Sequence, residues 1–385
     1  MYLAKGLVNK IHKHSFCEKI IVIDGITYFI NRKERTACIS DAYVGRSIFI
    51  PNQIKFKNKI YLVTSFSDRM NPMYSLTDIY FQSNSNIQII NKNLFIESKI
   101  VKIHIPASVK RICDHAFCQC FNLQEITFEK GSELQIIENS AFVFSSLQSI
   151  LISSKVAKLQ EGWCKCAWRL NDVSINSENP NYLKYENKFI IGKNHEKYDT
   201  FTFSPRNITK VTIPSFIREI GSFSFCVSQL KNILIPSSVK IINKRAFANC
   251  TKLKKIEFQK DSQLEIIGDE AFFNSSIKCI SIPLTVNLIG SYAFSKINSL
   301  QNVFFSNNSH LKIIGKYAFS DTSLRCISIP SSVEEIGDFA FSMCNNLSIV
   351  EFNSNVFSSL KFIFDNSLNA QIMIPKCIAK YANSY

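Results

Sequence analysis

Hydrophobic and polar positions recur with a fixed period along most of the chain. The stretch IPSSVEEIGDFAF ends at Phe341, and close copies of it end at Phe117, Phe247 and Phe294. The phenylalanine that ends each copy, called here the anchor phenylalanine, recurs at alternating spacings of 22 and 25 residues, so that a pair of repeats spans 47 residues. This period predicts a solenoid, in which each coil buries its apolar edge only against neighbouring coils. The anchors are Phe95, Phe117, Phe142, Phe225, Phe247, Phe272, Phe294, Phe319 and Phe341.

Each repeat also contains a short apolar run that begins five or six residues after its anchor. Examples are LQEITF from Leu123 and LRCISIP from Leu324, in which buried-type residues alternate with others. Such alternation is typical of a strand with one buried face. One strand per coil predicts about eleven coils whose strands form one parallel sheet along the array.

The residues between strand and anchor are typical of corners. Seven of the ten prolines follow the last apolar residue of a run, where Pro ends a strand without removing a central donor. Glycine stands four residues before five of the anchors, as at Gly290 and Gly315, which favours a positive φ or a tight turn there. The residues that follow, as in GDFAF, predict a single short helical turn that directs the anchor inward.

The combined pattern, IPSSVxxIGxxAFxxCxxLxxIxF, resembles the leucine-rich repeats of BspA-like proteins. The resemblance covers the chain from about Asp24 to Ala379 and rests on a long motif that occurs several times. It implies a β-rich leucine-rich-repeat solenoid. Repeats of this family occur in surface proteins of mucosal bacteria and are expanded in parasitic protists, so the resemblance implies a cell-surface antigen or adhesion protein.

Two stretches depart from the period. Between Phe142 and Phe225, one degenerate coil places Cys164 where an anchor is expected, and residues 188–204 indicate a β-hairpin. A second hairpin is expected near residues 20–40, covering the open edge of the first coil. The predicted organisation is an N-terminal hairpin cap (1–65), a first repeat block (66–175), an inserted β-hairpin (176–205), a second repeat block (206–352) and a C-terminal cap (353–385) with a final strand and a short helix.

Composition fits a folded, non-spanning protein. Hydrophobic residues make up 46% and charged residues 19%, which allows a substantial core. The 45 Lys and Arg against 30 Asp and Glu give a net charge of +15, but the basic residues form no consecutive block. The sequence shows neither the apolar segment of a secretory signal nor the roughly 18 apolar residues of a membrane span. A surface or secreted location therefore follows only from the resemblance, and a cytoplasmic location is the alternative.

The positions of the thirteen cysteines in the repeat indicate a structural role rather than disulfide formation or metal binding. Cys279 and Cys326 take the same strand position two coils apart, and roughly 10 Å at about 4.8 Å per coil is beyond disulfide reach. Cys120, Cys250 and Cys344 each follow an anchor by three residues and are expected to be buried. The cluster CDHAFCQC could suggest zinc. However, its cysteines take different positions of the repeat and the chain has no CxxC pair, so we predict no metal and no cofactor.

The sequence also contains no phosphate-binding loop, GxSxG or HExxH motif, so we predict a protein without enzymatic activity. What remains is the exposed face of the strands, the usual binding surface of a solenoid. This face is mixed in charge and includes outward apolar groups, as a protein partner favours. The candidate binding residues are Tyr80, Lys102, His104, Asn232, Leu234, Lys255, Asn302, Phe304 and Ile349.

These features support three hypotheses. The first is a monomeric interaction protein that binds a protein or glycan partner at a cell surface. The second is an intracellular scaffold or regulatory module built on the same repeat, favoured by the many thiols. The third is a polyanion-binding module that uses the net positive charge, which would make binding strongly salt-dependent. No specific recognition of nucleic acid is expected, because the strand face is short of Arg.

Overall fold

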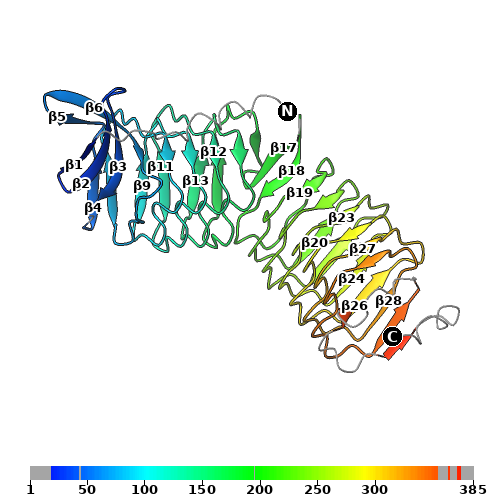
Figure 1. The fold of residues 1–385 in the computed structure, drawn as a ribbon. Coiled ribbons are helices and arrows are strands. Elements are labelled where there is room, and N and C mark those ends of the chain that lie inside the picture. Colours follow the sequence, from blue (N-terminus) through cyan, green and yellow to red (C-terminus); the bar gives the residue numbers. More distant parts are fainter. Residues whose placement is uncertain (1–18, 43–44, 195, 354–362, 365–370, 374–385) are drawn as a thin grey trace. The chain divides into compact units, whose positions relative to one another are not determined.

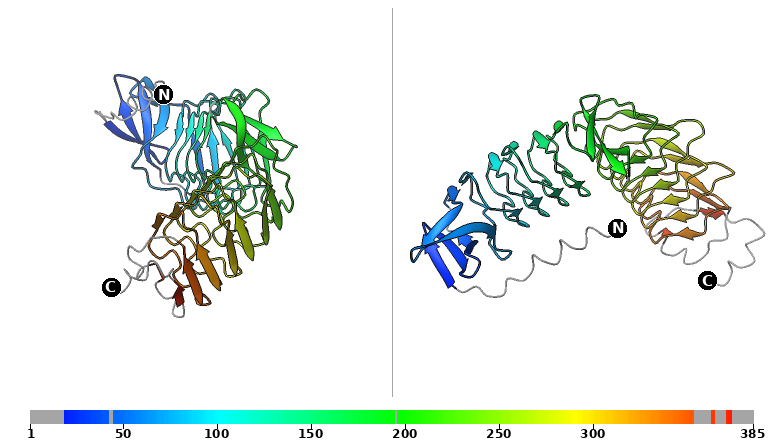
Figure 2. Two further views of the ribbon diagram at one scale, coloured as in Figure 1. Left: turned by 90° about the vertical axis from the view of Figure 1, so that its right-hand side faces the viewer. Right: turned by 90° about the horizontal axis from the view of Figure 1, so that it is seen from above.

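The structure is a computed structural model that describes residues 19–42, 45–194, 196–353, 363–364 and 371–373 (Figure 1). The chain divides into two compact units, Met1–Ala167 and Trp168–Tyr385. Both are parts of a β-solenoid of about 14 turns, and Figure 2 shows the strands of each unit stacked side by side from two further directions. The predicted solenoid of leucine-rich repeats is therefore confirmed.

Each coil contributes strands to two separate ladders. The four-residue strands of the first unit, called long strands, are β4 (Ser47–Ile50), β7 (Asp78–Phe81), β9 (Lys102–Ile105), β11 (Glu125–Phe128) and β13 (Ser149–Ile152). Those of the second unit are β15 (Asp172–Ile175), β20 (Asn232–Ile235), β22 (Lys255–Phe258), β24 (Cys279–Ile282), β26 (Asn302–Phe305), β28 (Cys326–Ile329) and β30 (Ile349–Phe352), with the three-residue β31 (Gln371–Met373) after them. Paired long strands, such as β20 and β22, run parallel and in register.

The second ladder consists of two-residue strands on the opposite limb of each coil, and the sequence analysis did not predict it. In the first unit these short strands are β8 (Ile89–Ile90), β10 (Arg111–Ile112), β12 (Ile136–Ile137) and β14 (Lys158–Leu159). In the second unit they are β19 (Glu219–Ile220), β21 (Ile241–Ile242), β23 (Ile266–Ile267), β25 (Leu288–Ile289), β27 (Ile313–Ile314) and β29 (Glu335–Ile336). The short strands are hydrogen-bonded without a break from β19 to β29, whereas the long strands pair in several separate sheets.

The prediction of about eleven coils was too low, since the structure has about 14 turns. The strand β4 lies in residues that had been assigned to the N-terminal cap, and β31 lies in residues assigned to the C-terminal cap. Residues 209–212 also form one limb of a coil but no strand. The helix predicted in the C-terminal cap lies outside the described residues, as does the N-terminal segment before Lys19.

The segments around the anchors are turns, and the predicted helical turn is not present. The reason is where the backbone hydrogen bonds go. The N–H of Phe247 donates to the carbonyl oxygen of Ala271 at 2.8 Å, and the N–H of Phe272 donates to that of Ala293 at 2.8 Å. These acceptors lie in the next coil, whereas a helix would require acceptors four residues back along the same coil. The N–H groups of the anchors thus link coils to each other, while flanking residues close the turn, as Ala246 does by donating to Asn243.

The anchor phenylalanines form a buried column of rings in each unit. All nine are fully buried. Adjacent rings are stacked, with centroid distances of 5.2 Å from Phe247 to Phe272 and 5.2 Å from Phe272 to Phe294. In the first unit the column ends at Trp163, whose ring meets Phe142 edge-on at 6.1 Å. Cys164 is buried beside it, because this coil takes its large ring from the preceding position.

The corner glycines are required by close approach and not by a positive φ. At Gly315 an added Cβ would lie 2.5 Å from the backbone N of Ser291 and 2.6 Å from the carbonyl carbon of Gly290. The positive φ angles occur two residues before the anchors instead, as at Glu270 (54°) and Tyr292 (57°). The glycines therefore allow the corners of neighbouring coils to touch, a reason that differs from the positive φ or tight turn expected from the sequence.

Both hairpins are present. The N-terminal sheet has the order β1-β2-β3-β6-β5 and consists of β1 (Lys19–Ile23), β2 (Ile26–Asn31), β3 (Thr36–Ala42), β5 (Gln53–Phe56) and β6 (Lys59–Phe66). The inserted element consists of β16 (Tyr182–Tyr185), β17 (Phe189–Asn194) and β18 (Lys197–Phe203). The strand β18 pairs with β19 and brings the Phe201 ring within 4.7 Å of Phe225, so the hairpin continues both the short-strand ladder and the ring column.

Truncating an anchor should be costly. We expect Phe272→Ala to lower the free energy of unfolding by about 3–5 kcal/mol, because the change leaves a cavity between coils. Hydrogen exchange should show lost protection mainly in the adjacent coils, since each coil stabilises only its neighbours. Chemical denaturation measures the total free energy of unfolding, and a loss below about 1 kcal/mol would contradict the buried role of the anchor.

The corner glycines offer a second test. We expect Gly315→Ala to destabilise the protein by roughly 1–3 kcal/mol, because the new methyl group meets backbone atoms that cannot move aside without separating two coils. The matched control is Gly45→Ala, where an added Cβ meets no atom within 4 Å. Equal denaturation midpoints for the two variants would show that the corners are not closely packed.

Candidate interaction face

The long strands present alternate side chains outward, because successive residues of a strand point to opposite sides. In β7, Ile79 is buried while Asp78 and Tyr80 are exposed, and β9 repeats the pattern. The parallel register places equivalent outward residues side by side, as with Phe49 beside Tyr80 and His104 beside Thr127. We call these outward residues the strand face and describe it for each unit separately.

In the first unit the strand face combines large apolar groups with polar ones. Phe49 is 56% exposed and Tyr80 is 59% exposed. A shallow depression continues from Tyr80 across the neighbouring strands. It is lined by Asp78, Tyr80, Lys102, His104, Glu125 and Thr127. Three of the predicted binding residues, Tyr80, Lys102 and His104, are thus brought together.

Two polar contacts order this depression. The Nδ1 atom of His104 lies 2.8 Å from the hydroxyl oxygen of Thr127, and the Nζ atom of Lys102 lies 2.8 Å from a carboxylate oxygen of Glu125. The hydrogen bond to Glu125 raises the pKa of Lys102. Lys102 is largely exposed and Glu125 partly exposed, so this ion pair contributes little to stability and stays available to a ligand.

The second unit carries the other predicted residues, spread over several coils. Asn232, Leu234, Lys255, Phe304 and Ile349 are exposed and Asn302 is half-buried. Lys255 pairs with Glu257 of its own strand at 2.6 Å. Phe304 stands beside Ser281 and Ile349 beside Cys326, so each large apolar group has a small or polar neighbour on the preceding strand. The apolar groups of this unit are therefore not gathered in one place.

Sequence reasoning missed Phe49. It belongs to IFIP, the same apolar run followed by proline that marks the later strands, but it lies among residues that were assigned to the N-terminal cap. Leu151, exposed on β13, is a further outward apolar residue that is not among the predicted binding residues. Because Phe49 extends the row that contains Tyr80, the apolar part of the strand face begins one coil earlier than predicted.

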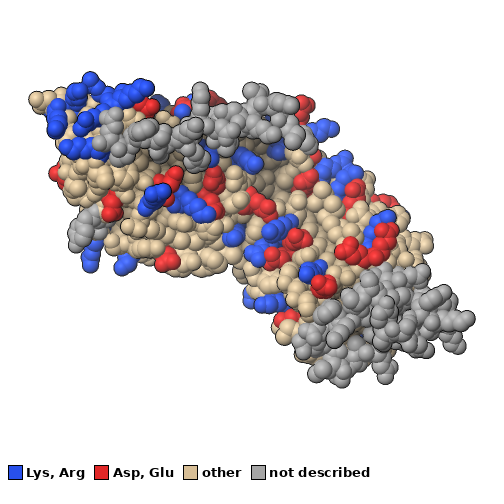
Figure 3. Space-filling view, in the orientation of Figure 1, with Lys and Arg blue, Asp and Glu red and all other residues tan. Residues whose placement is uncertain are grey.

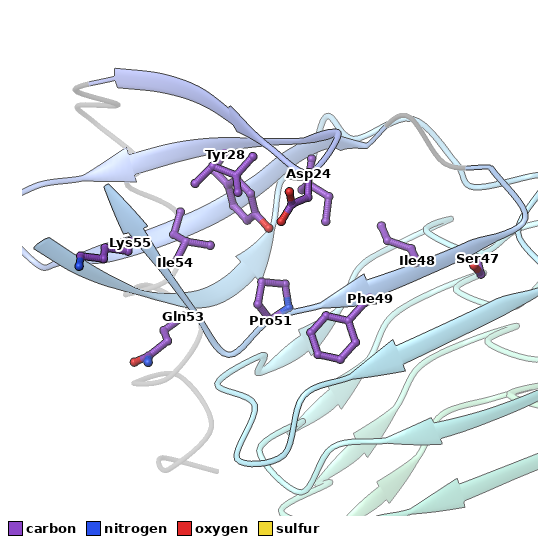
Figure 4. Close-up of a pocket in the computed structure, with 11 residues that line it drawn as sticks. Asp24, Tyr28, Ser47, Ile48, Phe49, Pro51, Gln53, Ile54 and Lys55 are labelled. Carbon is purple, nitrogen blue, oxygen red and sulfur yellow. The ribbon is translucent and has the colours of Figure 1, made fainter. Parts of the chain in front are cut away.

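A cavity lies between the N-terminal sheet and β4. Figure 4 shows its lining, which includes Tyr28, Pro51 and Ile54, with the hydroxyl group of Tyr28 directed toward the carboxylate of Asp24. Burial, together with the charge of Asp24, raises the pKa of Tyr28 to about 12. Tyr28 therefore remains a neutral phenol over the physiological pH range.

The recurrent cysteines serve the scaffold. The thiol of Cys250 donates to the carbonyl oxygen of Phe225 at 3.0 Å and lies 3.3 Å from the hydroxyl group of Ser228. Cys120 and Cys344 make the equivalent contacts with the anchor and the Ser or Thr of their own preceding coils. Burial raises the pKa of Cys250 to about 11 and that of Cys120 to about 12, so both stay protonated thiols.

The cysteine-rich segment around Cys113 does not form a metal centre in the structure. Among the described residues, no group of three or more His, Cys, Asp or Glu side chains is placed to hold a metal ion. All eleven described cysteines are free of disulfide bonds, with Cys279 and Cys326 exposed. No candidate membrane-spanning helix occurs in the part of the chain that the structure describes.

Comparison with known proteins agrees with the repeat pattern. The family model described as the BspA type leucine rich repeat region, in six copies, matches residues 64–185, 174–276 and 265–385. The chain therefore belongs to the BspA-type leucine-rich-repeat family, a scaffold for protein interaction. No curated protein matches the chain.

Solved structures share the fold. The pneumococcal vaccine antigen PcpA is 18% identical with a TM-score of 0.61, and the match covers 94% of this chain and 90% of that one. A leucine rich cell surface protein from Faecalibacterium prausnitzii is 18% identical with a TM-score of 0.53, covering 94% and 97%. A leucine-rich repeat protein from Eubacterium ventriosum is 18% identical with a TM-score of 0.54, covering 91% and 99%.

The thiols provide a test of the coil register. In native protein we expect Cys279 and Cys326 to be alkylated rapidly, whereas Cys120, Cys250 and Cys344 should react only after unfolding, because burial and a raised pKa suppress their thiolates. Mass spectrometry after timed alkylation measures each site. Fast labelling of Cys250, or a disulfide between Cys279 and Cys326, would contradict the register.

Proposed function

We propose that this protein is a non-enzymatic interaction protein that binds a protein or glycan partner through the strand face of its first unit. The observation that carries the proposal is the row of exposed large side chains that begins with Phe49 and Tyr80 and continues along the depression formed by β7, β9 and β11. Aromatic side chains of this kind dominate binding energies where a partner covers them, because they bury a large area with few rotatable bonds.

The polar groups beside the aromatic row would supply specificity. Asp78, His104, Glu125 and Thr127 place hydrogen-bond donors and acceptors on adjacent strands at a fixed spacing. Their positions are set by the hydrogen-bonded backbone of the ladder, so little entropy is lost when they engage a partner. A rigid platform with aromatic and polar side chains suits both extended protein segments and sugars.

A cell-surface role in adhesion, as a surface antigen, is the setting that we propose. It is supported by membership of the BspA-type family and by the similarity in fold to a vaccine antigen and to a cell-surface protein. The exposed Cys279 and Cys326 favour the second candidate, an intracellular scaffold, since free thiols on a surface persist best in a reducing compartment. Protease treatment of intact cells distinguishes the two, because only a surface protein is cleaved.

The binding face can be tested with a matched pair of variants. We expect Tyr80→Ala to weaken binding to epithelial cells or to an arrayed glycan by about tenfold or more, because a central aromatic contact is lost. The control is Phe121→Ala, which removes an aromatic group of the same unit that is 55% exposed but lies outside the long strands. Quantitative binding of labelled protein measures both, and equal effects would contradict the proposed face.

A further inference from the structure

Positive charge is concentrated in the N-terminal sheet. Residues 19–66 contain eight Lys and Arg against three Asp and Glu, a net charge of +5. One eighth of the chain therefore carries one third of its net charge of +15. Figure 3 shows the Lys and Arg side chains gathered over this end of the first unit, where Figure 1 places β5 and β6.

Four of these basic residues lie at or near the tip of the β5–β6 hairpin, two of them close to the ring of Phe56. The Nζ atom of Lys19 lies 5.1 Å from the centroid of the Phe56 ring, and that of Lys57 lies 5.9 Å from it. Lys59 is opposite Phe56 in the hairpin register, and Lys55 precedes it. We call Lys19, Lys55, Lys57 and Lys59 the lysine cluster. Because β1 and β5 are the two edges of the sheet, the cluster forms where these edges approach each other.

The three lysines of the hairpin, Lys55, Lys57 and Lys59, have little compensating negative charge. The stretch from Asn52 to Ser67 contains no Asp or Glu. Within the described part of the chain, no carboxylate lies at ion-pair distance from Lys55, Lys57 or Lys59. The ammonium groups of Lys55, Lys57 and Lys59 lie within five residues of each other at one hairpin tip and repel each other, so an external anion would relieve an existing electrostatic cost.

The same hairpin exposes aliphatic side chains on its outer face. Ile54 and Tyr61 point to the core, whereas Lys55 and Ile60 are paired on the other side, followed by Leu62. Ile60 is 50% exposed and Leu62 is 42% exposed. Strand β1 adds Ile20 next to Lys19, with 60% of its surface exposed. Apolar groups thus share the outer face with Lys55, at the hairpin whose tip carries Lys57 and Lys59.

We propose that the lysine cluster and the neighbouring aliphatic side chains bind the surface of an anionic lipid membrane. Binding at such a surface combines burial of apolar groups in the interface with attraction of basic side chains to acidic headgroups, and both components are present here. Lysine is a mobile point charge that suits headgroups at variable positions. A protein partner is less favoured, because protein interfaces are depleted in lysine and enriched in arginine. A sulfated glycan would not use Ile60 and Leu62.

This site is separate from the strand face, so a test of membrane binding is independent of a test of the proposed function. Tyr80 belongs to the strand ladder of the coils, whereas the lysine cluster belongs to the five-stranded sheet. A protein that adheres through one surface and rests on a lipid surface through another could hold its partner close to a membrane. Peripheral contact of this kind requires no spanning segment.

The test is co-sedimentation of the full chain with vesicles. We expect binding to vesicles that contain about 30 mol% phosphatidylserine and not to pure phosphatidylcholine, with loss of binding as salt rises to about 500 mM. The triple variant Lys55→Gln/Lys57→Gln/Lys59→Gln should bind roughly 100-fold more weakly, at about fivefold for each lost charge. The matched control, Lys252→Gln/Lys254→Gln/Lys260→Gln, removes the same charge from exposed positions of the second unit and should bind like the unchanged protein.

A second variant separates lipid from other polyanions. Ile60→Ser/Leu62→Ser should weaken vesicle binding roughly tenfold, since apolar burial is lost, while binding of heparin should be unchanged. All of these side chains are exposed, and circular dichroism verifies that each variant folds. The proposal is overturned if the unchanged protein fails to bind the acidic vesicles, if the two lysine triple variants bind alike, or if Ile60→Ser/Leu62→Ser binds vesicles normally. The last outcome would identify a general polyanion site.

Discussion

The solenoid depends on backbone hydrogen bonds that leave each coil and end on the next one. The N–H of Phe294 donates to the carbonyl oxygen of Ala318, and the N–H of Phe319 donates to that of Ala340. Buried backbone groups must find partners, and the N–H groups of these anchors find theirs on the next coil, while flanking residues such as Ala318 donate within their own turn. This single constraint sets the distance between coils, brings the anchor rings to stacking distance and fixes the spacing of outward side chains on the strand face.

Much of this architecture could be predicted from the sequence because periodicity directly reports which residues are buried. The 22 and 25 spacings of the anchors and the alternation in runs such as LQEITF were sufficient to identify most of the coils and long strands, and the family. The prediction of a helical turn was wrong because GDFAF is compatible with either a helix or a turn. Only the position of the carbonyl oxygen that accepts each backbone hydrogen bond decides between them. The short-strand ladder was missed because a pair such as Ile266–Ile267 is too brief to show alternation.

The candidate site was less predictable than the fold. Outward positions follow from the strand period, so the exposure of Tyr80 and His104 could be anticipated. What the period cannot give is which outward residues share a depression, since that depends on packing between β7, β9 and β11. The lysine cluster was beyond sequence reasoning for the same reason. Lys19 and Phe56 are far apart along the chain and meet only because the sheet brings its two edges together.

Coils of 22 residues alternate with coils of 25 residues, and this alternation determines how such a chain can change its length. The hydroxyl-to-thiol contacts of Ser228 with Cys250 and of Thr322 with Cys344 always join one member of a coil pair to the other. A genetic duplication or deletion of 47 residues would therefore keep equivalent side chains of neighbouring coils in contact. Loss of a single coil would instead bring together two coils of the same length, whose corner residues do not match. Recombination between repeats can lengthen or shorten the face in steps of two coils, while the ends that cover it stay the same.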